Sequence, residues 1–279
     1  MCIRDSLTAC EMKTTFGRNK SLRAKNIQYK MLTADDNYRL PVFSIPNKMK
    51  LKILFLSALT ILIATTSMAQ DLADEVDLFM GVHGNSNCVI GPQLPHGSVN
   101  PSPDTPKGGQ NGYDENDKIR GFSQLHVSGI GWSRYGQILL SPQNGFSAKE
   151  TGHDSPKANE IAKPYCYAAT LTRYGIRTEL SPTHHGVFYR FTFNKPNNNN
   201  ILLDLRHNIP QDIVPIVKGT FNGGEINYNE KQRLISGYGI YAGGFGSKQP
   251  YRVYFAMKID DPDATVTITN NDTKALYAK

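Results

Sequence analysis

An all-β fold, a large antiparallel β-sandwich, is predicted for the C-terminal part of this 279-residue sequence. Apolar and polar residues alternate over Val187–Phe193 and over Tyr251–Ile259, and this two-residue period places one face of a strand in a core and the other in solvent. Turn-forming clusters such as Asn194–Asn200 and Asp260–Asp263 separate the runs. Many short strands with frequent turn signals are typical of a sandwich or barrel.

Further strands follow from the same pattern. Tyr165–Thr172 and Ile176–Ser181 flank the turn residues Arg173-Tyr174-Gly175, which predicts a hairpin. Additional short apolar runs predict strands at Ile138–Leu140, Ile201–Leu205, Ile213–Val217, Gly237–Tyr241 and Thr265–Thr269.

Two segments differ from this pattern. Residues 72–80 fit an amphipathic helix, with Leu72, Val76 and Phe79 on one side. Residues 81–136 are rich in Gly, Pro, Asn, Ser and His and have no periodicity. An irregular stretch of this length is uncommon in a compact domain unless it is functional. We therefore interpret it as long, site-forming loops mounted on the sandwich.

A secretory signal peptide is predicted at residues 49–69. A basic start at Met49-Lys-Leu-Lys52 is followed by the apolar run Ile53–Ala64 and then by Ser67-Met68-Ala69, which fits the small-residue rule for cleavage after Ala69. A membrane anchor is the alternative, but the run is shorter than the roughly 20 apolar residues that a spanning helix needs. We expect no membrane span after cleavage.

The predicted signal changes how the chain and its charge are interpreted. A signal starts at its own Met, so residues 1–48 are expected to be an upstream segment and not native structure. Residues 1–69 carry 11 Lys+Arg and 4 Asp+Glu, a net of +7, and residues 70–279 carry the remaining 20 of each, a net of zero. The excess positive charge is thus no argument for a nucleic-acid partner. An exported protein in the periplasm or at the cell surface is expected.

The sequence leaves the state of the cysteines open. Cys88 and Cys166 remain after cleavage, and they form either a disulfide or two buried thiols. Asp260, Asp261 and Asp263 resemble a calcium loop, but Pro262 interrupts them and no bidentate Glu follows at the required spacing, so a solvated turn is expected.

Five sequence blocks in residues 81–136 and just beyond carry a family resemblance. They are Gly91-Pro-Gln-Leu-Pro-His-Gly97, Pro101-Ser-Pro-Asp-Thr105, Asn111-Gly-Tyr113, Arg120-Gly-Phe-Ser-Gln-Leu-His126 with Val127-Ser-Gly-Ile-Gly-Trp132, and Tyr135-Gly-Gln-Ile138. Their order and spacing resemble the N-terminal domain of glycoside hydrolase family 92, the calcium-dependent exo-α-mannosidases. His96 stands where that family has Phe, and Ser133–Gln137 lacks the two carboxylates of the family's S-D-Y-G-D.

The resemblance implies a galactose-mutarotase-like supersandwich at residues 70–279, truncated before an (α/α)6 catalytic domain. That second domain would supply the acid, the base and the calcium ligands of an inverting mannosidase. Inversion needs two carboxyl groups about 6.5–9.5 Å apart, and the resemblance places no such pair here. We therefore expect no catalytic residue, no metal ligand and no activity in this chain alone.

Two functions remain open on this basis. In the first, the chain forms the sugar pocket of an α-mannosidase-like hydrolase, with an α-mannoside-like glycan and the C-terminal domain as its partners. In the second, it is a stand-alone carbohydrate-binding sandwich without catalysis. In either case, the residues expected to bind the sugar are Trp132, Gly91, Ser128, His126, Arg134 and Asp104.

Each candidate also has a structural interpretation. Trp132 follows glycines that allow close backbone approach, so its ring suits stacking on a sugar, but it also fits a core position. His126 is equally suited to satisfying buried loop backbone, and Asp104 to capping a turn. Arg134 could pair with a carboxylate of the second domain or lie free on the surface.

The predicted cleavage site can be tested directly. N-terminal sequencing of the exported product should give Gln70 as the first residue, because Ala69 completes the small-residue motif. An exported product that retains residues 49–69 would instead identify the apolar run as an anchor.

Overall fold

The computed structural model describes residues 2–3, 72–83, 88–108, 111–127, 135–209, 219–244, 249–271 and 275–278. No helix in these ranges is long and apolar enough to cross a membrane. The signal peptide expected at residues 49–69 and the strand expected at Ile213–Val217 both lie outside them.

Two β-sheets account for the strands of the described ranges. The larger sheet contains β1 (Cys2–Ile3), β5 (Lys157–Lys163), β6 (Cys166–Leu171), β7 (Ile176–Pro182), β8 (Val187–Phe193), β10 (Thr220–Asn229), β11 (Leu234–Ala242) and β12 (Tyr251–Ile259). The smaller sheet contains β2 (Ser102–Asp104), β3 (Gly121–Ser123), β4 (Leu139–Asn144), β9 (Asn199–Asp204), β13 (Ile268–Asn271) and β14 (Ala275–Ala278).

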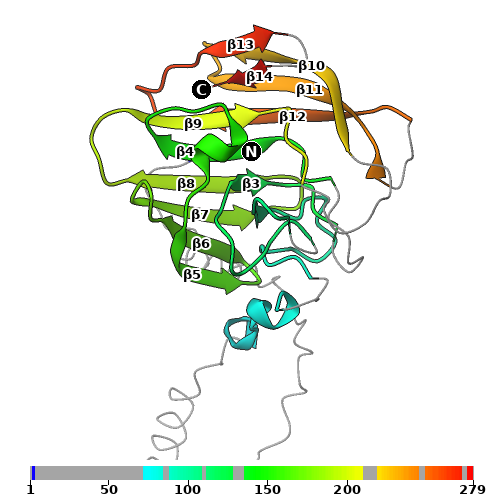
Figure 1. Ribbon diagram of the computed structural model, residues 1–279, viewed down its shortest axis with the longest axis vertical. Coiled ribbons are helices and arrows are strands. Elements are labelled where there is room, and N and C mark those ends of the chain that lie inside the picture. The colour runs from blue at the N-terminus through cyan, green and yellow to red at the C-terminus, as the bar shows by residue number, and fades with distance from the viewer. Residues whose placement is uncertain are drawn as a thin grey trace, which may run out of the picture. The chain divides into compact units, whose positions relative to one another are not determined.

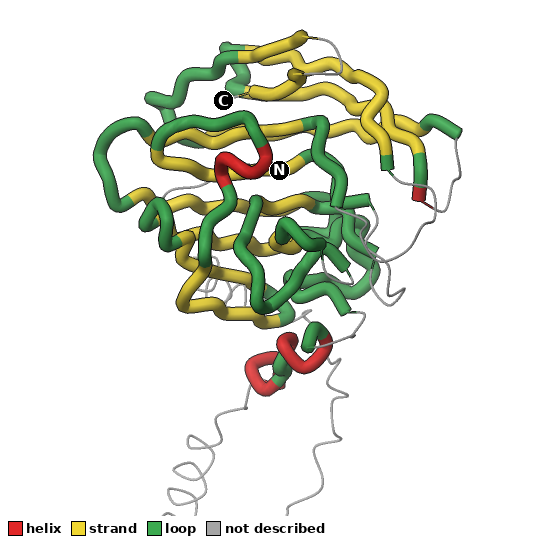
Figure 2. The backbone as a smooth tube through the Cα atoms, in the orientation of Figure 1, coloured by secondary structure: helices red, strands yellow, loops and turns green. Residues whose placement is uncertain are grey.

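The strand order confirms the predicted antiparallel β-sandwich (Figure 1). The larger sheet runs β10-β11-β12-β1-β8-β7-β6-β5, and the smaller runs β13-β14-β9-β4-β3-β2. Every pairing between these strands is antiparallel except the two made by β1, which lies parallel to both β8 and β12. Strand and loop dominate the chain trace, with helix confined to short turns (Figure 2).

Aromatic side chains from both sheets form the centre of the core. Phe122 of β3 is 1% exposed and reaches across the sandwich to Tyr167 of β6 and to Tyr189 and Phe191 of β8, with ring centroids 6.3–6.5 Å apart. Leu203 of β9 belongs to the same buried cluster. The sheets are therefore joined by interdigitating inner faces, as the period-2 alternation requires.

The alternation predicted for β8 and β12 is confirmed, with one exception. Along β12 the odd-numbered residues are more buried than the even-numbered ones, and Met257 is 3% exposed. In β8 the polar-face residue Arg190 is nevertheless buried, and its Nη1 lies 3.6 Å from Oε2 of the buried Glu179 in β7. The register sets Glu179 and Arg190 opposite one another, so the two buried charges form a cross-strand ion pair.

The predicted hairpin is also confirmed, since β6 and β7 pair from Leu171 opposite Ile176. Gly175 has φ +68°, which a residue with a side chain adopts only at a cost. The amphipathic helix predicted for residues 72–80 is wrong. Two 3-10 turns, Leu72–Glu75 and Leu78–Gly81, replace it, because the extended Asp77 accepts a 2.9 Å hydrogen bond from Phe79 N and starts the second turn.

The segment predicted as irregular loops contains two short strands that join the smaller sheet. β2 is formed by Ser102-Pro103-Asp104 and β3 by Gly121-Phe122-Ser123, so two of the sequence blocks are neighbouring strands paired with Asp104 opposite Gly121. The rest of the segment, where it is described, is loop and turn. The loops are thus held by the sandwich itself, as expected.

The cysteines follow neither of the two expected arrangements. Cys88 is a free thiol and is exposed, so it forms no disulfide with Cys166. Cys166 is fully buried and its sulfur is disulfide-bonded.

Replacing the central aromatic residue should test the sandwich core. Phe122→Ala should lower the free energy of unfolding by about 3–5 kcal/mol, because it opens a cavity between the two sheets. Urea denaturation gives this value. The matched control is Tyr254→Ala at a 68% exposed ring, which should cost about 0.5 kcal/mol or less. Equal losses in the two variants would contradict the assignment of Phe122 to the core.

Candidate functional site

Two of the six candidate binding residues lie in direct contact. Asp104 ends β2, and His126 follows β3 by three positions. The Nε2 atom of His126 lies 2.6 Å from Oδ1 of Asp104, and neither side chain is accessible to solvent. Three candidates lie outside the described residues: Ser128, Trp132 and Arg134.

Strand pairing brings the carboxylate and the imidazole together. The Arg120 N–H donates a 2.7 Å hydrogen bond to the Asp104 carbonyl, which holds β2 beside β3. The Nδ1 atom of His126 donates to the Asn100 carbonyl at 2.9 Å, so both ring nitrogens face oxygen acceptors. His126 therefore donates a hydrogen bond to a buried backbone carbonyl. This is the structural role that the sequence also suggested for it. The turn cap expected of Asp104 is not formed, because its carboxylate binds side chains instead.

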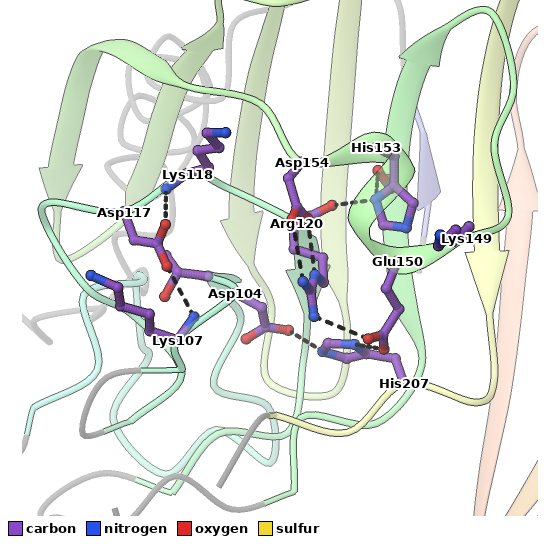
Figure 3. Close-up of polar contacts among 12 residues, drawn as sticks. Asp104, Lys107, Asp117, Lys118, Arg120, Lys149, Glu150, His153, Asp154 and His207 are labelled. Atoms are coloured by element: carbon purple, nitrogen blue, oxygen red, sulfur yellow. Dashed lines mark hydrogen bonds and ion pairs between the residues drawn. The ribbon is translucent and has the colours of Figure 1, made fainter. Parts of the chain in front are cut away.

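His207 is a second histidine on the same carboxylate. Its Nε2 atom lies 3.1 Å from Oδ2 of Asp104, and its side chain is fully buried. Its Nδ1 atom lies 3.6 Å from Oε1 of Glu150, which is an ion-pair distance and too long for a hydrogen bond. Figure 3 shows this ring between the two carboxylates. One aspartate thus joins the β2–β3 pair to the segment that follows β9.

Arg120 extends the cluster through the short helix α3 (Glu150–His153). Its Nη1 atom donates to Oε2 of Glu150 at 3.1 Å. Its Nε and Nη2 atoms make a bidentate pair with Asp154, at 2.9 and 3.2 Å. We call these six residues the Asp104 network: Asp104, Arg120, His126, Glu150, Asp154 and His207. It contains three carboxylates and three basic groups.

The acidic and basic groups of the network stabilise one another in their charged forms. Burial alone lowers the pKa of His207, but the carboxylates of Asp104 and Glu150 outweigh it and raise the pKa to about 9. Burial opposes ionisation of Asp104, yet His126 and His207 lower its pKa to about 2. The adjacent His207, and then Arg120, lower the pKa of Glu150 to about 2 against the effect of burial. His207 is therefore a buried cation between two anions at neutral pH.

Most side chains of the network are inaccessible to a substrate. A general acid or base must come within hydrogen-bond reach of its substrate, but Asp104 is 0% exposed. Only Glu150 has a largely exposed side chain, at 48%. It borders a shallow hollow of about 380 Å³ with Lys149, Asp204 and Arg206. Within the described ranges, no group of three His, Cys, Asp or Glu side chains is arranged to hold a metal ion.

The glycines of the sequence blocks allow this close packing. A Cβ atom on Gly112 would lie 2.9 Å from Oδ1 of Asp104 and 3.0 Å from the His126 ring, and its φ of +94° also favours glycine. A Cβ on the candidate Gly91 would lie 1.6 Å from the Pro101 carbonyl oxygen. Gly91 is thus required for close backbone packing against Pro101.

Four members of the network were missed by sequence reasoning. Arg120 begins a quoted block, but a lone arginine gives no sign of its partner. Glu150, Asp154 and His207 lie outside every block, and nothing local marks them. His207 is 103 positions from Asp104, so only the three-dimensional pairing of β4 with β9 brings it near.

Comparison with protein families decides the classification. The model of the "Glycosyl hydrolase family 92 N-terminal domain" matches residues 75–279. The chain belongs to glycosyl hydrolase family 92. The resemblance of the sequence blocks is thereby confirmed. Asp104, Arg120 and His126 are the members of the Asp104 network that these blocks supply. No curated protein matches the chain.

Solved structures of family 92 enzymes share the fold. A family GH92 α-mannosidase from Bacteroides thetaiotaomicron, solved alone and in complex with mannoimidazole, is 27% identical with a TM-score of 0.58, over 67% of this chain. A further GH92 glycosyl hydrolase is 20% identical, with a TM-score of 0.58 over 74% of this chain and 29% of its own. The chain spans about a quarter of the α-mannosidase, 25–26% of its length.

The buried cation predicts a specific pH dependence of stability. The folded pKa of His207, about 9, lies above its ordinary value of 6.5, so its stabilisation is complete below pH 6.5 and is lost as pH rises through about 9. The stabilisation from Asp104 and Glu150 is present above their ordinary values of 3.8 and 4.5 and is lost as pH falls toward 2. The network should stabilise most between about pH 4.5 and 6.5.

His207→Gln should measure this contribution. At pH 6 the variant should be less stable by roughly 3 kcal/mol, because two carboxylates lose their shared cation. The difference should shrink above pH 9, where the wild-type ring is neutral. Urea denaturation of both proteins from pH 4 to pH 10 gives the profile. His184→Gln, at an exposed histidine, is the matched control. A loss for His207→Gln that stays constant with pH would contradict a charged ring.

Proposed function

We propose that this chain is the N-terminal domain of an exported, α-mannosidase-like glycoside hydrolase, and that its loops complete a sugar pocket with a C-terminal catalytic domain. Family membership supports the hydrolase class. The Bacteroides α-mannosidase, at 27% identity, supports an α-linked mannoside as the substrate. The predicted signal peptide supports a place in the periplasm or at the cell surface.

The observation that carries this proposal is the anchoring of one loop. Gly136 N donates to the Leu125 carbonyl at 3.0 Å, which joins the described residues on either side of residues 126–135. His126, the first residue of this segment, is hydrogen-bonded to Asp104. Fixed flanking residues are what a binding residue such as Trp132 requires, because side chains positioned by a rigid scaffold lose little entropy on binding.

Catalysis itself is assigned to the missing part of the protein. The carboxylates of the Asp104 network are already bound to His126, His207 and Arg120, so none is free to act on a sugar or to bind calcium. We therefore place the acid, the base and the calcium ligands in the C-terminal domain. A stand-alone binding module remains the second candidate, and it differs in requiring measurable sugar affinity in this chain alone.

Activity of the whole protein tests the role of Trp132. In the full-length enzyme, Trp132→Ala should lower kcat/KM on α-mannosides about tenfold or more, equivalent to about 1.4 kcal/mol or more of lost stacking. The melting temperature should change little. Trp132→Phe keeps an aromatic face and should recover part of the activity. Unchanged activity with a collapsed melting temperature would identify Trp132 as a core residue.

The 279-residue chain alone separates the two candidate functions. It should not hydrolyse α-mannosides, and isothermal titration calorimetry should detect no binding of mannose or mannobiose at millimolar concentration. Binding by the isolated chain would favour the stand-alone module.

A further inference from the structure

Three neighbouring strands of the larger sheet, β10, β11 and β12, present an outer face away from the core (Figure 1). Ile226, Ile235 and Met257, one residue from each strand, are buried in the core between the sheets. Because side chains alternate along a strand, the neighbours of these residues lie on the opposite face. The outer face is therefore formed by the even-numbered residues of β11 and β12 and by the odd-numbered residues of β10 from Glu225 onward.

A pair of tyrosines lies at the centre of this outer face. The register places Glu225, Tyr238 and Tyr254 in one row across the three strands. The rings of Tyr238 and Tyr254 have centroids 5.6 Å apart, and their planes are inclined by 46°. Tyr254 is 68% exposed, more than any other aromatic side chain in the described ranges. A cross-strand aromatic pair stabilises a sheet, but a ring this exposed also offers its surface to a ligand.

Planar polar groups flank the two rings. The guanidinium of Arg252, which lies two positions before Tyr254, is 5.1 Å from the centroid of the Tyr238 ring. On β10, Asn227 Nδ2 donates a 2.7 Å hydrogen bond to Oε1 of Glu225, and both side chains are exposed. We call these five residues the tyrosine face: Glu225, Asn227, Tyr238, Arg252 and Tyr254.

The tyrosine face matches the two kinds of surface that a sugar presents. The C–H groups on the flat side of a pyranose ring are attracted to the negative face of an aromatic ring. The hydroxyl groups at its edge accept hydrogen bonds from a guanidinium or an amide and donate them to a carboxylate. Glu225 and Arg252 carry opposite charges, so the face favours a neutral ligand over an ionic one.

We propose that the tyrosine face is a second, non-catalytic binding surface that holds polymers of α-linked mannose (α-mannan). This rests on the proposed function, in which the substrate is an α-linked mannoside. The residues expected to bind the reacting sugar belong to the loops of residues 81–136, whereas the tyrosine face is formed by β10, β11 and β12. The surface therefore keeps the protein on a polymeric substrate and takes no part in the reaction.

The small area of the tyrosine face determines the size of the ligand. Two tyrosine rings cover roughly one or two sugar units, so mannose and mannobiose should bind too weakly to be detected at millimolar concentration. A polysaccharide presents many such units, and this multivalency raises the apparent affinity. The 46° inclination favours one twisted chain over a flat, packed layer, because inclined rings cannot both lie against one plane.

Binding of the 279-residue chain to α-mannan immobilised on a biosensor tests the proposal. Tyr254→Ala should weaken the apparent affinity about tenfold, as expected for truncation of a central aromatic contact, and Tyr254→Trp should strengthen it through the larger ring. Phe146→Ala, at a 37% exposed ring outside the tyrosine face, is the matched control and should bind like the wild type. Absence of binding, or equal binding by the wild type and Tyr254→Ala, would overturn the proposal.

The nature of the contact can be tested with salt and with a second polymer. Because α-mannan is neutral, binding should persist in about 1 M salt, where charges are screened beyond about 3 Å. Loss of binding in salt would identify an ionic contact, and equal binding to an immobilised α-glucan would remove the assignment to mannose. Either result would overturn the proposal.

Two other occupants of the tyrosine face have distinct outcomes. Self-association of the 279-residue chain in sedimentation velocity that is lost in Tyr254→Ala would assign the face to a second copy. A melting temperature that falls in Tyr254→Ala of the full-length protein, but not of the 279-residue chain, would assign it to the C-terminal domain. The proposal predicts a monomer and unchanged melting temperatures, so either outcome would contradict it.

This proposal and the proposed function fail separately. In the full-length protein, Tyr254→Ala should leave kcat/KM on a small aryl α-mannoside unchanged and slow the release of mannose from α-mannan. Unchanged release from α-mannan would remove the tyrosine face and leave the proposed function intact. Binding through Tyr254 in a full-length protein without glycosidase activity would do the reverse. Binding of α-mannan that survives Tyr254→Ala but is lost in Trp132→Ala would place the sugar in the loops and overturn the tyrosine face.

Discussion

The carboxylate of Asp104 is the group on which the loops of this domain depend. It is fully buried, and it holds one imidazole on each oxygen. A buried charge is costly unless its partners are present with good geometry. The end of β2, the segment after β3 and the segment after β9 must therefore come together in the same step of folding. Removing any one partner leaves an uncompensated charge, so these segments behave as a cooperative unit.

The strands could be predicted because their evidence is local. The alternation of apolar and polar residues that predicts β12 lies within β12 itself. The turn residues that predict the β6–β7 hairpin directly precede Ile176, where β7 begins. The helix expected at residues 72–80 failed at Asp77, where a side-chain hydrogen bond to Phe79 N competes with helix continuation. The apolar spacing was present, but one polar side chain decided the outcome.

The site was only partly predictable, for a different reason. Asp104 and His126 stand in recognisable blocks, and the sequence placed both in one candidate site. Their partner His207 has no local signature, because its position depends on β9 pairing with β4. The sequence blocks that carry the family resemblance contain residues required for close backbone packing more than residues able to act on a substrate. Gly112 and Gly121 occur in them because Asp104 and the Leu140 carbonyl leave no space for a side chain.

The long sequence separation within the network has a consequence for how the domain is made. Asp104 and His207 are 103 positions apart, so the contact cannot form until more than a hundred further residues have been synthesised. Contacts of such separation form late in folding, because the chain must first lose the entropy of closing the intervening loop. Until then, Asp104 lacks its contact with His207.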